Sequence, residues 1–182
     1  MECFTRFSSK QLIDLNLEKG AVFSNCLNYR FLLWRCWDKK LPKVLFIGLN
    51  PSVADDVKDD ATTKKLISFA KLNGYGGLVL GNCFPFIATN PKNLNDYSFL
   101  RQNDNWLKSI RPNLSEVVFA WGNFSTVYEN KRDVDMQKLF PSARIISKNK
   151  NGSPKHPLYA KFGTITENYS SIRKKEFAKT YV

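Results

Sequence analysis

Histidine is nearly absent from this 182-residue chain, which contains a single one, His156. Cysteine is also scarce, and the four cysteines form no Cys-x-x-Cys pair, which argues against a zinc or iron–sulfur site. Reduced, mostly buried thiols in a cytoplasmic protein are the better interpretation. We therefore expect no metal and no other cofactor.

Long apolar runs are missing as well. None approaches the roughly 20 residues that a membrane-spanning helix needs. The first residues, MECFTRFSSKQL, carry Glu2 and no apolar segment, so no secretory signal is predicted. The length fits one domain over residues 1–182 with a substantial core. We expect a cytoplasmic monomer with no membrane association.

Acidic residues are few. The chain has 16 Asp and Glu against 28 Lys and Arg, a formal net charge of +12. The excess is concentrated, because residues 138–182 hold ten Lys or Arg and two Glu. A local cluster of this kind favours phosphate binding and therefore a nucleic-acid partner, most simply DNA. The alternative is a generic basic protein from a lysine-rich proteome.

Four short apolar runs stand out in what the chain does contain: Val44–Leu49, Gly77–Gly81, Val117–Trp121 and Ala143–Ser147. They do not alternate with polar residues, which is typical of parallel strands buried on both faces. Helical stretches separate them, and the first of these should end at Asn73-Gly74. The pattern predicts an α/β fold, a three-layer α/β/α sandwich with a central, mainly parallel four-stranded sheet.

Two further elements are expected beside this sheet. An N-terminal antiparallel β-hairpin is predicted within residues 21–38, where aromatic runs flank an asparagine-rich turn. A basic C-terminal helix is predicted over residues 168–181. Helical segments are also expected at 103–110 and 125–140.

A polar cluster follows every predicted strand. The clusters are Asn50-Pro51-Ser52, Asn82-Cys83-Phe84, Gly-Asn-Phe-Ser at 122–125, and the stretch 148–159. The carboxyl ends of parallel strands form the ligand crevice of open α/β sheets. The clusters should therefore face a common pocket, although Asn-Pro-Ser taken alone favours a turn or a helix cap.

Together these clusters resemble the motifs of the uracil-DNA glycosylase superfamily over roughly residues 44–162. Gly48–Ser52 is similar to the first motif, which carries the water-positioning residue, and Leu78–Phe84 is similar to the strand whose asparagine reads the base. Val117–Asn123 resembles the strand before the final loop. Lys155–Tyr159 resembles the second motif, which is His-Pro-Ser in much of the superfamily.

The resemblance is closer still to an uncharacterised domain-of-unknown-function family of bacterial and phage proteins, interpreted as a branch of that superfamily. It covers roughly residues 22–160 and includes NYRFLLWRCWD, LNPSVADD, DDAT, GYGGLVLGNCF, TNPKNL and GSPKHPLY. Two positions depart from the classical uracil enzymes. No tyrosine follows Pro51, and no serine follows His156-Pro157.

The resemblance implies cleavage of the N-glycosidic bond of an extruded base. Asn50 would hold the attacking water, since an amide accepts a hydrogen bond but takes up no proton near neutral pH, and Pro51 would fix its turn. His156 would donate to the oxyanion of the leaving base. Asn82 would read an amide-like base edge and Phe84 would stack on the base, although a turn and core packing are alternatives. Gly48, Leu49 and Ser52 complete the expected substrate site.

The basic loop before and around His156 is the expected contact with nucleic acid. Lys148, Lys150 and Lys155 would bind phosphates. Tyr159 and Phe162 would enter the duplex beside the flipped nucleotide, or else pack back onto the sheet.

Acidic residues between the first strand and its helix raise a metal alternative. They are Asp55, Asp56, Asp59 and Asp60. We favour helix N-terminal charges instead, with Asp55 as a second candidate for positioning water.

Three hypotheses follow for function. The first is a DNA glycosylase-like hydrolase that acts on an extruded, modified or damaged base. The second is a non-catalytic nucleic-acid-binding module that has kept the pocket. The third is an N-glycosidase of free nucleosides or nucleotides, which the basic C-terminal quarter disfavours relative to a polymer.

Overall fold

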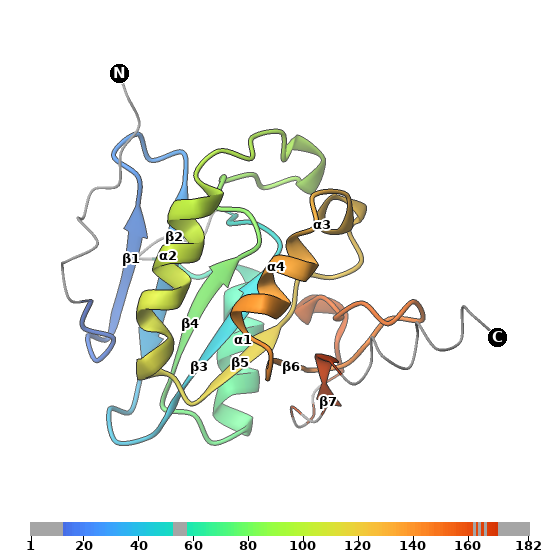
Figure 1. Ribbon diagram of the computed structural model, residues 1–182. Helices are drawn as coiled ribbons and strands as arrows, with labels where there is room; N and C mark the ends of the chain where they lie inside the picture. Colours follow the sequence, from blue (N-terminus) through green and yellow to red (C-terminus); the bar gives the residue numbers. More distant parts are fainter. Residues whose placement is uncertain (1–12, 53–57, 162, 164, 166, 171–182) are drawn as a thin grey trace.

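The computed structural model describes residues 13–52, 58–161, 163, 165 and 167–170. Within these residues the chain forms seven strands: β1 (Lys19–Phe23), β2 (Arg30–Cys36), β3 (Lys43–Gly48), β4 (Gly77–Asn82), β5 (Glu116–Phe119), β6 (Arg144–Ile145) and β7 (Glu167–Asn168). They form one sheet in the order β1-β2-β4-β3-β5-β6-β7, with β1 and β2 at one side in Figure 1.

The centre of the sheet is parallel, as the four apolar runs predict. β3 pairs in parallel with both β4 and β5, and β5 pairs in parallel with β6. The expectation of a four-stranded sheet is nevertheless wrong. The hairpin β1-β2 joins the sheet as an antiparallel extension of β4, and β7 adds an antiparallel strand to β6. Every residue of β2 is buried, so this strand lies inside the sheet and does not merely flank it.

Helices cover both faces of the sheet. They are α1 (Ala61–Leu72), α2 (Leu100–Ile110), α3 (Ser125–Glu129) and α4 (Arg132–Leu139). Phe69 of α1 packs in one core with Phe46 of β3. Ile47, the next residue of β3, faces the opposite core with Leu107 of α2 and Met136 of α4. Successive residues of β3 therefore fill two cores, and Figure 1 shows α1 behind the sheet with the other helices in front.

Local sequence explains where these helices begin and end. The Asp60 side chain caps α1, and the helix ends at Asn73 followed by Gly74 with φ +77°, as predicted. The expected helical segment 125–140 is divided into α3 and α4, because Lys131 has a left-handed φ of 54° between them. The predicted C-terminal helix falls mostly outside the described residues. Of the three residues of its range that the structure describes, Asn168 belongs to β7, whereas 169 and 170 are helical.

Two of the cysteines, Cys36 and Cys83, are free and buried. Cys26 is disulfide-bonded, which corrects the expectation of reduced thiols for this residue. In the described part of the chain, no helix combines the length and the apolar character needed to cross a membrane.

Candidate functional site

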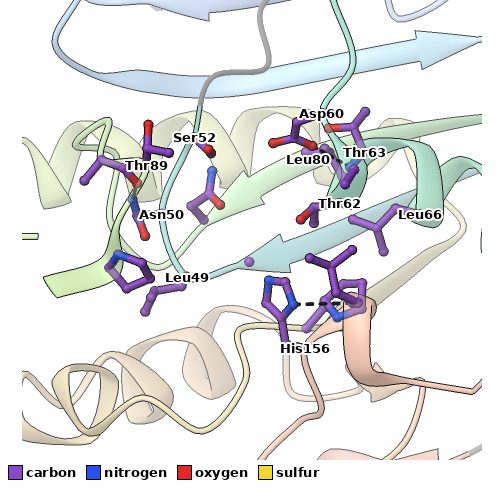
Figure 2. A pocket seen from close by; sticks show the side chains of 18 of the residues that line it. Leu49, Asn50, Ser52, Asp60, Thr62, Thr63, Leu66, Leu80, Thr89 and His156 are labelled. Atoms are coloured by element: carbon purple, nitrogen blue, oxygen red, sulfur yellow. Dashed lines mark hydrogen bonds between the residues drawn. The ribbon is translucent and has the colours of Figure 1, made fainter. Parts of the chain in front are cut away.

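A pocket of about 430 Å³ opens at the carboxyl ends of the parallel strands (Figure 2). The chain leaves β3 to form β4 on one side of it and later returns to form β5 on the other side. Adjacent connections diverge at such a switch point and leave room for a ligand. The ends of β3, β4 and β5 line the pocket together with the start of α1 and the loop after β6. This is the edge of the sheet to which the sequence assigns the polar clusters.

Asn50 is held rigidly in the turn that follows β3. Its Nδ2 donates to the carbonyl oxygens of Pro51, at 2.9 Å, and Ala88, at 2.7 Å. The Ala88 backbone N–H donates in return to the Pro51 carbonyl at 3.0 Å, so the turn is tied to the segment after β4. Both amide hydrogens are used, and Oδ1 has no partner among the described residues. Asn50 therefore presents an oriented hydrogen-bond acceptor at the pocket wall.

Asn82, the last residue of β4, lies beside Gly48, the last residue of β3, as a register pair. A Cβ at Gly48 would lie 2.8 Å from Asn82 Oδ1, so only glycine leaves room for this side chain. The residue is 5% exposed, and its Nδ2 has no hydrogen-bond partner in the described structure. A buried amide donor without a partner is costly in an unliganded protein. An acceptor on a ligand in the pocket would satisfy it.

His156 lies in the loop after β6 and caps the short 3-10 helix η3 (Pro157–Tyr159). Its Nδ1 accepts a hydrogen bond from the Leu158 backbone N–H at 3.4 Å, drawn in Figure 2. Burial lowers the pKa of His156, and the negative charge of Asp60 partly offsets this shift. The neutral imidazole prevails at pH 7, and because Nδ1 is the acceptor its hydrogen is on Nε2. His156 thus has a donor available at the pocket.

The loop of His156 packs closely against the turn after β5. A Cβ at Gly122 would lie 3.2 Å from the Cβ of His156, and Gly122 has φ +86°. Phe124, two residues later, is half-buried and lines the pocket. Phe84 is fully buried and packs against Tyr97 with ring centroids 5.4 Å apart, away from the pocket lining. Phe124 and Tyr159 supply the phenyl rings of the described lining, whereas the position of Phe84 matches the core-packing alternative and not the stacking role.

The start of α1 forms another wall. Asp60 Oδ1 accepts from the Thr63 backbone N–H at 2.7 Å, and both residues line the pocket with Thr62. Asp59 pairs with Arg35, Oδ1 to Nη2 at 2.7 Å. The helix-cap interpretation of the acidic stretch therefore holds for Asp60. Asp55 and Asp56 lie outside the described residues, within which no group of three metal-ligating side chains is found.

The remaining residues expected at the site are distributed around the pocket. Leu49 and Ser52 line it, whereas buried Pro51 takes part through its backbone. Tyr159 also lines it and is 75% exposed, beside Leu158 at 43%. The rings of Tyr159 and His156 lie 5.9 Å apart. Phe162 lies outside the described residues.

The three lysines of the basic loop are not part of the pocket lining. Lys148 and Lys150 are exposed and Lys155 is half-buried. The turn that carries them is closed by a bridge between Lys148 and Pro154. It is attached to the turn after β5 by a hydrogen bond from Asn151 Nδ2 to Asn123 Oδ1 at 2.6 Å. The lysines therefore project from a braced turn that leads into His156.

Several lining residues were not singled out as site residues from the sequence. These are Arg30, Asp60, Thr62, Thr63, Thr89 and Phe124. Phe124 belongs to the polar cluster at 122–125, and Asp60 to the acidic stretch before the first predicted helix, so for these two the position in the chain was informative. Arg30 begins β2, whose antiparallel pairing with β4 brings that end to the pocket edge. No local signal predicts this pairing.

Comparison with known proteins identifies the family. Residues 30–158 match a protein family described as "Protein of unknown function (DUF1643)". The chain belongs to this family. The match spans the strands and loops that build the pocket, from Arg30 to Leu158. No curated protein and no solved structure matches the chain.

Proposed function

We propose that this DUF1643 protein is a DNA glycosylase-like hydrolase that cleaves the N-glycosidic bond of an extruded, modified or damaged base. The observation that carries the proposal is the meeting of Asn50, Asn82 and His156 at one pocket. The reaction needs a held water, a donor for the departing base anion and a pocket for the base. Asn50 Oδ1, His156 Nε2–H and the buried Asn82 amide have the chemistry for these three tasks.

The resemblance to the uracil-DNA glycosylase superfamily supports the same assignment. The three residues fall in the segments that are similar to the water-positioning motif, the base-reading strand and the His-Pro motif. Phe124 offers an aromatic wall for a base. The classical uracil enzymes have a tyrosine after this proline, and here none follows Pro51. No residue therefore argues for uracil as the substrate, and a modified base is the better candidate.

The rim of the pocket suits a polymer substrate. Tyr159 and Leu158 protrude beside His156 and would fill the gap that an extruded nucleotide leaves in the stack. Lys148 and Lys150 lie exposed on the braced turn that precedes them and would contact phosphates. These features favour DNA over a free nucleoside.

The test is incubation of the full chain with duplex and single-stranded oligonucleotides that carry a panel of damaged and modified bases. Abasic-site formation is scored by alkaline strand cleavage. We expect base release from at least one modified oligonucleotide and none from its unmodified counterpart. A chain that binds the oligonucleotides but releases no base would overturn the hydrolase and leave the non-catalytic recognition module, in which Asn82 still reads the extruded base.

A further inference from the structure

Water-driven cleavage needs a group that takes a proton from the water. Asn50 can orient the water, but an amide does not accept a proton near neutral pH. His156 serves as the donor to the base, with Nδ1 already engaged by the Leu158 N–H. Among the described residues that line the pocket, Asp60 is the only carboxylate. Within the described lining, Asp60 is therefore the side chain suited to general-base chemistry that has no other part in the proposed reaction.

The Asp60 side chain is fixed at one oxygen and open at the other. Oδ1 accepts the Thr63 backbone N–H at 2.7 Å and so orients the carboxylate. Oδ2 has no hydrogen bond or ion pair with any described residue, and the residue is half-buried. Asp59, its neighbour, instead accepts from Arg35 Nε at 2.9 Å and pairs with its Nη2. Asp59 is not part of the pocket lining, so of the two acids only Asp60 presents a carboxylate there.

Asp60 and His156 stand on different walls of the pocket. Figure 2 shows Asp60 with Thr63 at the start of α1, and His156 rising from the loop on the opposite side. The two are close enough for the charge of Asp60 to act on the imidazole. Arg30 is the other charged residue in the described lining. A reacting nucleotide placed between the walls would have its base near His156 and a carboxylate near the sugar.

We propose that Asp60 is the general base of the hydrolysis, an assignment that rests on the glycosylase function proposed for this pocket. Water held by Asn50 adds its oxygen to C1′ of the sugar while the C1′–N bond breaks. The bonding electron pair leaves with the base, whose anion is stabilised by His156 Nε2–H and then protonated from solvent. One proton of the water passes to Asp60 Oδ2 and returns to solvent afterwards. The Asp60 charge also favours the oxocarbenium-like sugar.

The sharpest variant is Asp60→Asn. Asparagine caps a helix about as well as aspartate, so α1 should keep its stability while the base is lost. Under single-turnover conditions on the base that the parent releases, we expect turnover to fall by roughly 10²-fold or more. DNA affinity and thermal midpoint should stay within error. Asp60→Ser should give the same loss of turnover, because serine also caps a helix but is no general base at neutral pH. This second variant shows that the loss does not come from the new asparagine side chain.

A second readout does not depend on turnover. His156 is the only histidine in the chain, so its ring protons can be titrated by NMR without assignment. Because the Asp60 charge raises the pKa of His156, Asp60→Asn should lower that pKa further. Asp59→Asn is the control for turnover, since its Arg35 pair lies outside the reaction and its loss should affect stability alone.

The outcomes are distinct. If the parent releases no base from any substrate, the proposed function and this inference fall together. If the parent is active and both folded Asp60 variants turn over within threefold of it, only the general-base role falls. A large loss in turnover in both variants with unchanged DNA affinity, together with the shifted His156 titration, supports the role.

Discussion

The two ends of the parallel strands differ in whether their polar side chains have hydrogen-bond partners within the protein. At the amino ends, Tyr75 donates to Glu116, which also accepts from Arg144 Nη1 at 2.8 Å. Burial and the nearby Glu116 raise the pKa of Tyr75. At the carboxyl ends, Asn82 Nδ2 has no partner in the described structure. The side-chain hydrogen bonds of Asn50 are made by Nδ2, so its Oδ1 stays available to the pocket.

Tyr75, Glu116 and Arg144 at the amino ends of the strands have partners within the protein, whereas Asn82 Nδ2 at the carboxyl ends has none among the described residues. The two edges of the sheet therefore serve different purposes. Polar groups that satisfy one another stabilise the fold and leave nothing to bind. Groups that are held in place yet unsatisfied cost stability and are available to a ligand. The amino-terminal edge is therefore a closed network, and the carboxyl-terminal edge is an open site. Substitutions at the two edges should change different observables.

The largest expected effect is at the open edge. His156→Ala removes the Nε2–H that, in the proposed mechanism, donates to the departing base, and turnover should fall by roughly 10²–10³-fold. His156→Gln keeps an N–H and should retain part of the activity. Single-turnover base release measures both. DNA affinity equal to the parent's is required as a control, and parental turnover in a folded His156→Ala protein would remove the histidine from the mechanism.

The closed edge should show the reverse behaviour. Glu116→Gln removes the charged partner of Arg144 and of the Tyr75 hydroxyl, so the free energy of unfolding should fall by about 1.5–3 kcal/mol. Urea denaturation measures the loss. Base release by the folded fraction should be unchanged, and a drop in turnover at full folding would show that the two edges are not independent.

The central strands could be predicted from local sequence. The position of β2 could not, for a physical reason. The buried runs at Val44–Leu49 and Gly77–Gly81 predict adjacent central strands because apolar residues fill both faces. The position of β2 depends on pairing with β4, a contact between distant segments that no periodicity encodes. In the sequence, the apolar and aromatic residues of β2 suit an edge hairpin as well as a central strand, and only the structure shows that all of them are buried.

The sequence predicts where the site lies, but it does not predict every residue that lines it. Asn50 and Asn82 follow predicted strands, so topology alone brings them to one edge. Phe84 and Phe124 also both follow strands, and the sequence does not tell which ring turns toward the pocket. That depends on how the chain leaves each strand: the segment after Phe84 returns to pair Phe86 with Tyr29.

Gly48→Ala should produce a smaller effect at the open edge. The added Cβ would meet Asn82 Oδ1 at 2.8 Å and displace the amide, a crowding cost of about 1–3 kcal/mol in the liganded state. Affinity for an oligonucleotide that carries the modified base should fall roughly tenfold. Gly163→Ala is the matched control, because no heavy atom lies within 4 Å of its added Cβ. Equal affinities for the two variants would mean that Asn82 does not contact the ligand.

The smallest effect should come from the basic turn. Alanine at Lys148, Lys150 and Lys155 should weaken DNA binding by roughly tenfold or less in total, since a solvent-accessible charge of this kind contributes on average about 0.4 kcal/mol. The loss should be the same for all sequences. The slope of log affinity against log salt should become shallower by about 1 for each phosphate that the variant no longer neutralises.

Three lysines from the closed side of the molecule provide the control for that experiment. Lys39, Lys40 and Lys108 are exposed and precede β3 or β5. Their replacement by alanine changes the net charge equally but should leave the salt slope close to the parent's. A slope that falls equally in both triple variants would assign binding to overall charge and not to the turn beside His156.

The most direct test of the open site is single-turnover base release by Asn50→Ala. The variant removes the side-chain acceptor Asn50 Oδ1, which two hydrogen bonds from Nδ2 hold in place after β3. Asn113→Ala, at an exposed position before β5, is the matched control. We expect Asn50→Ala to fold and bind DNA like the parent while releasing base roughly 10²–10³-fold more slowly, with Asn113→Ala unchanged. A folded Asn50→Ala protein that releases base at the parental rate would contradict the proposed mechanism.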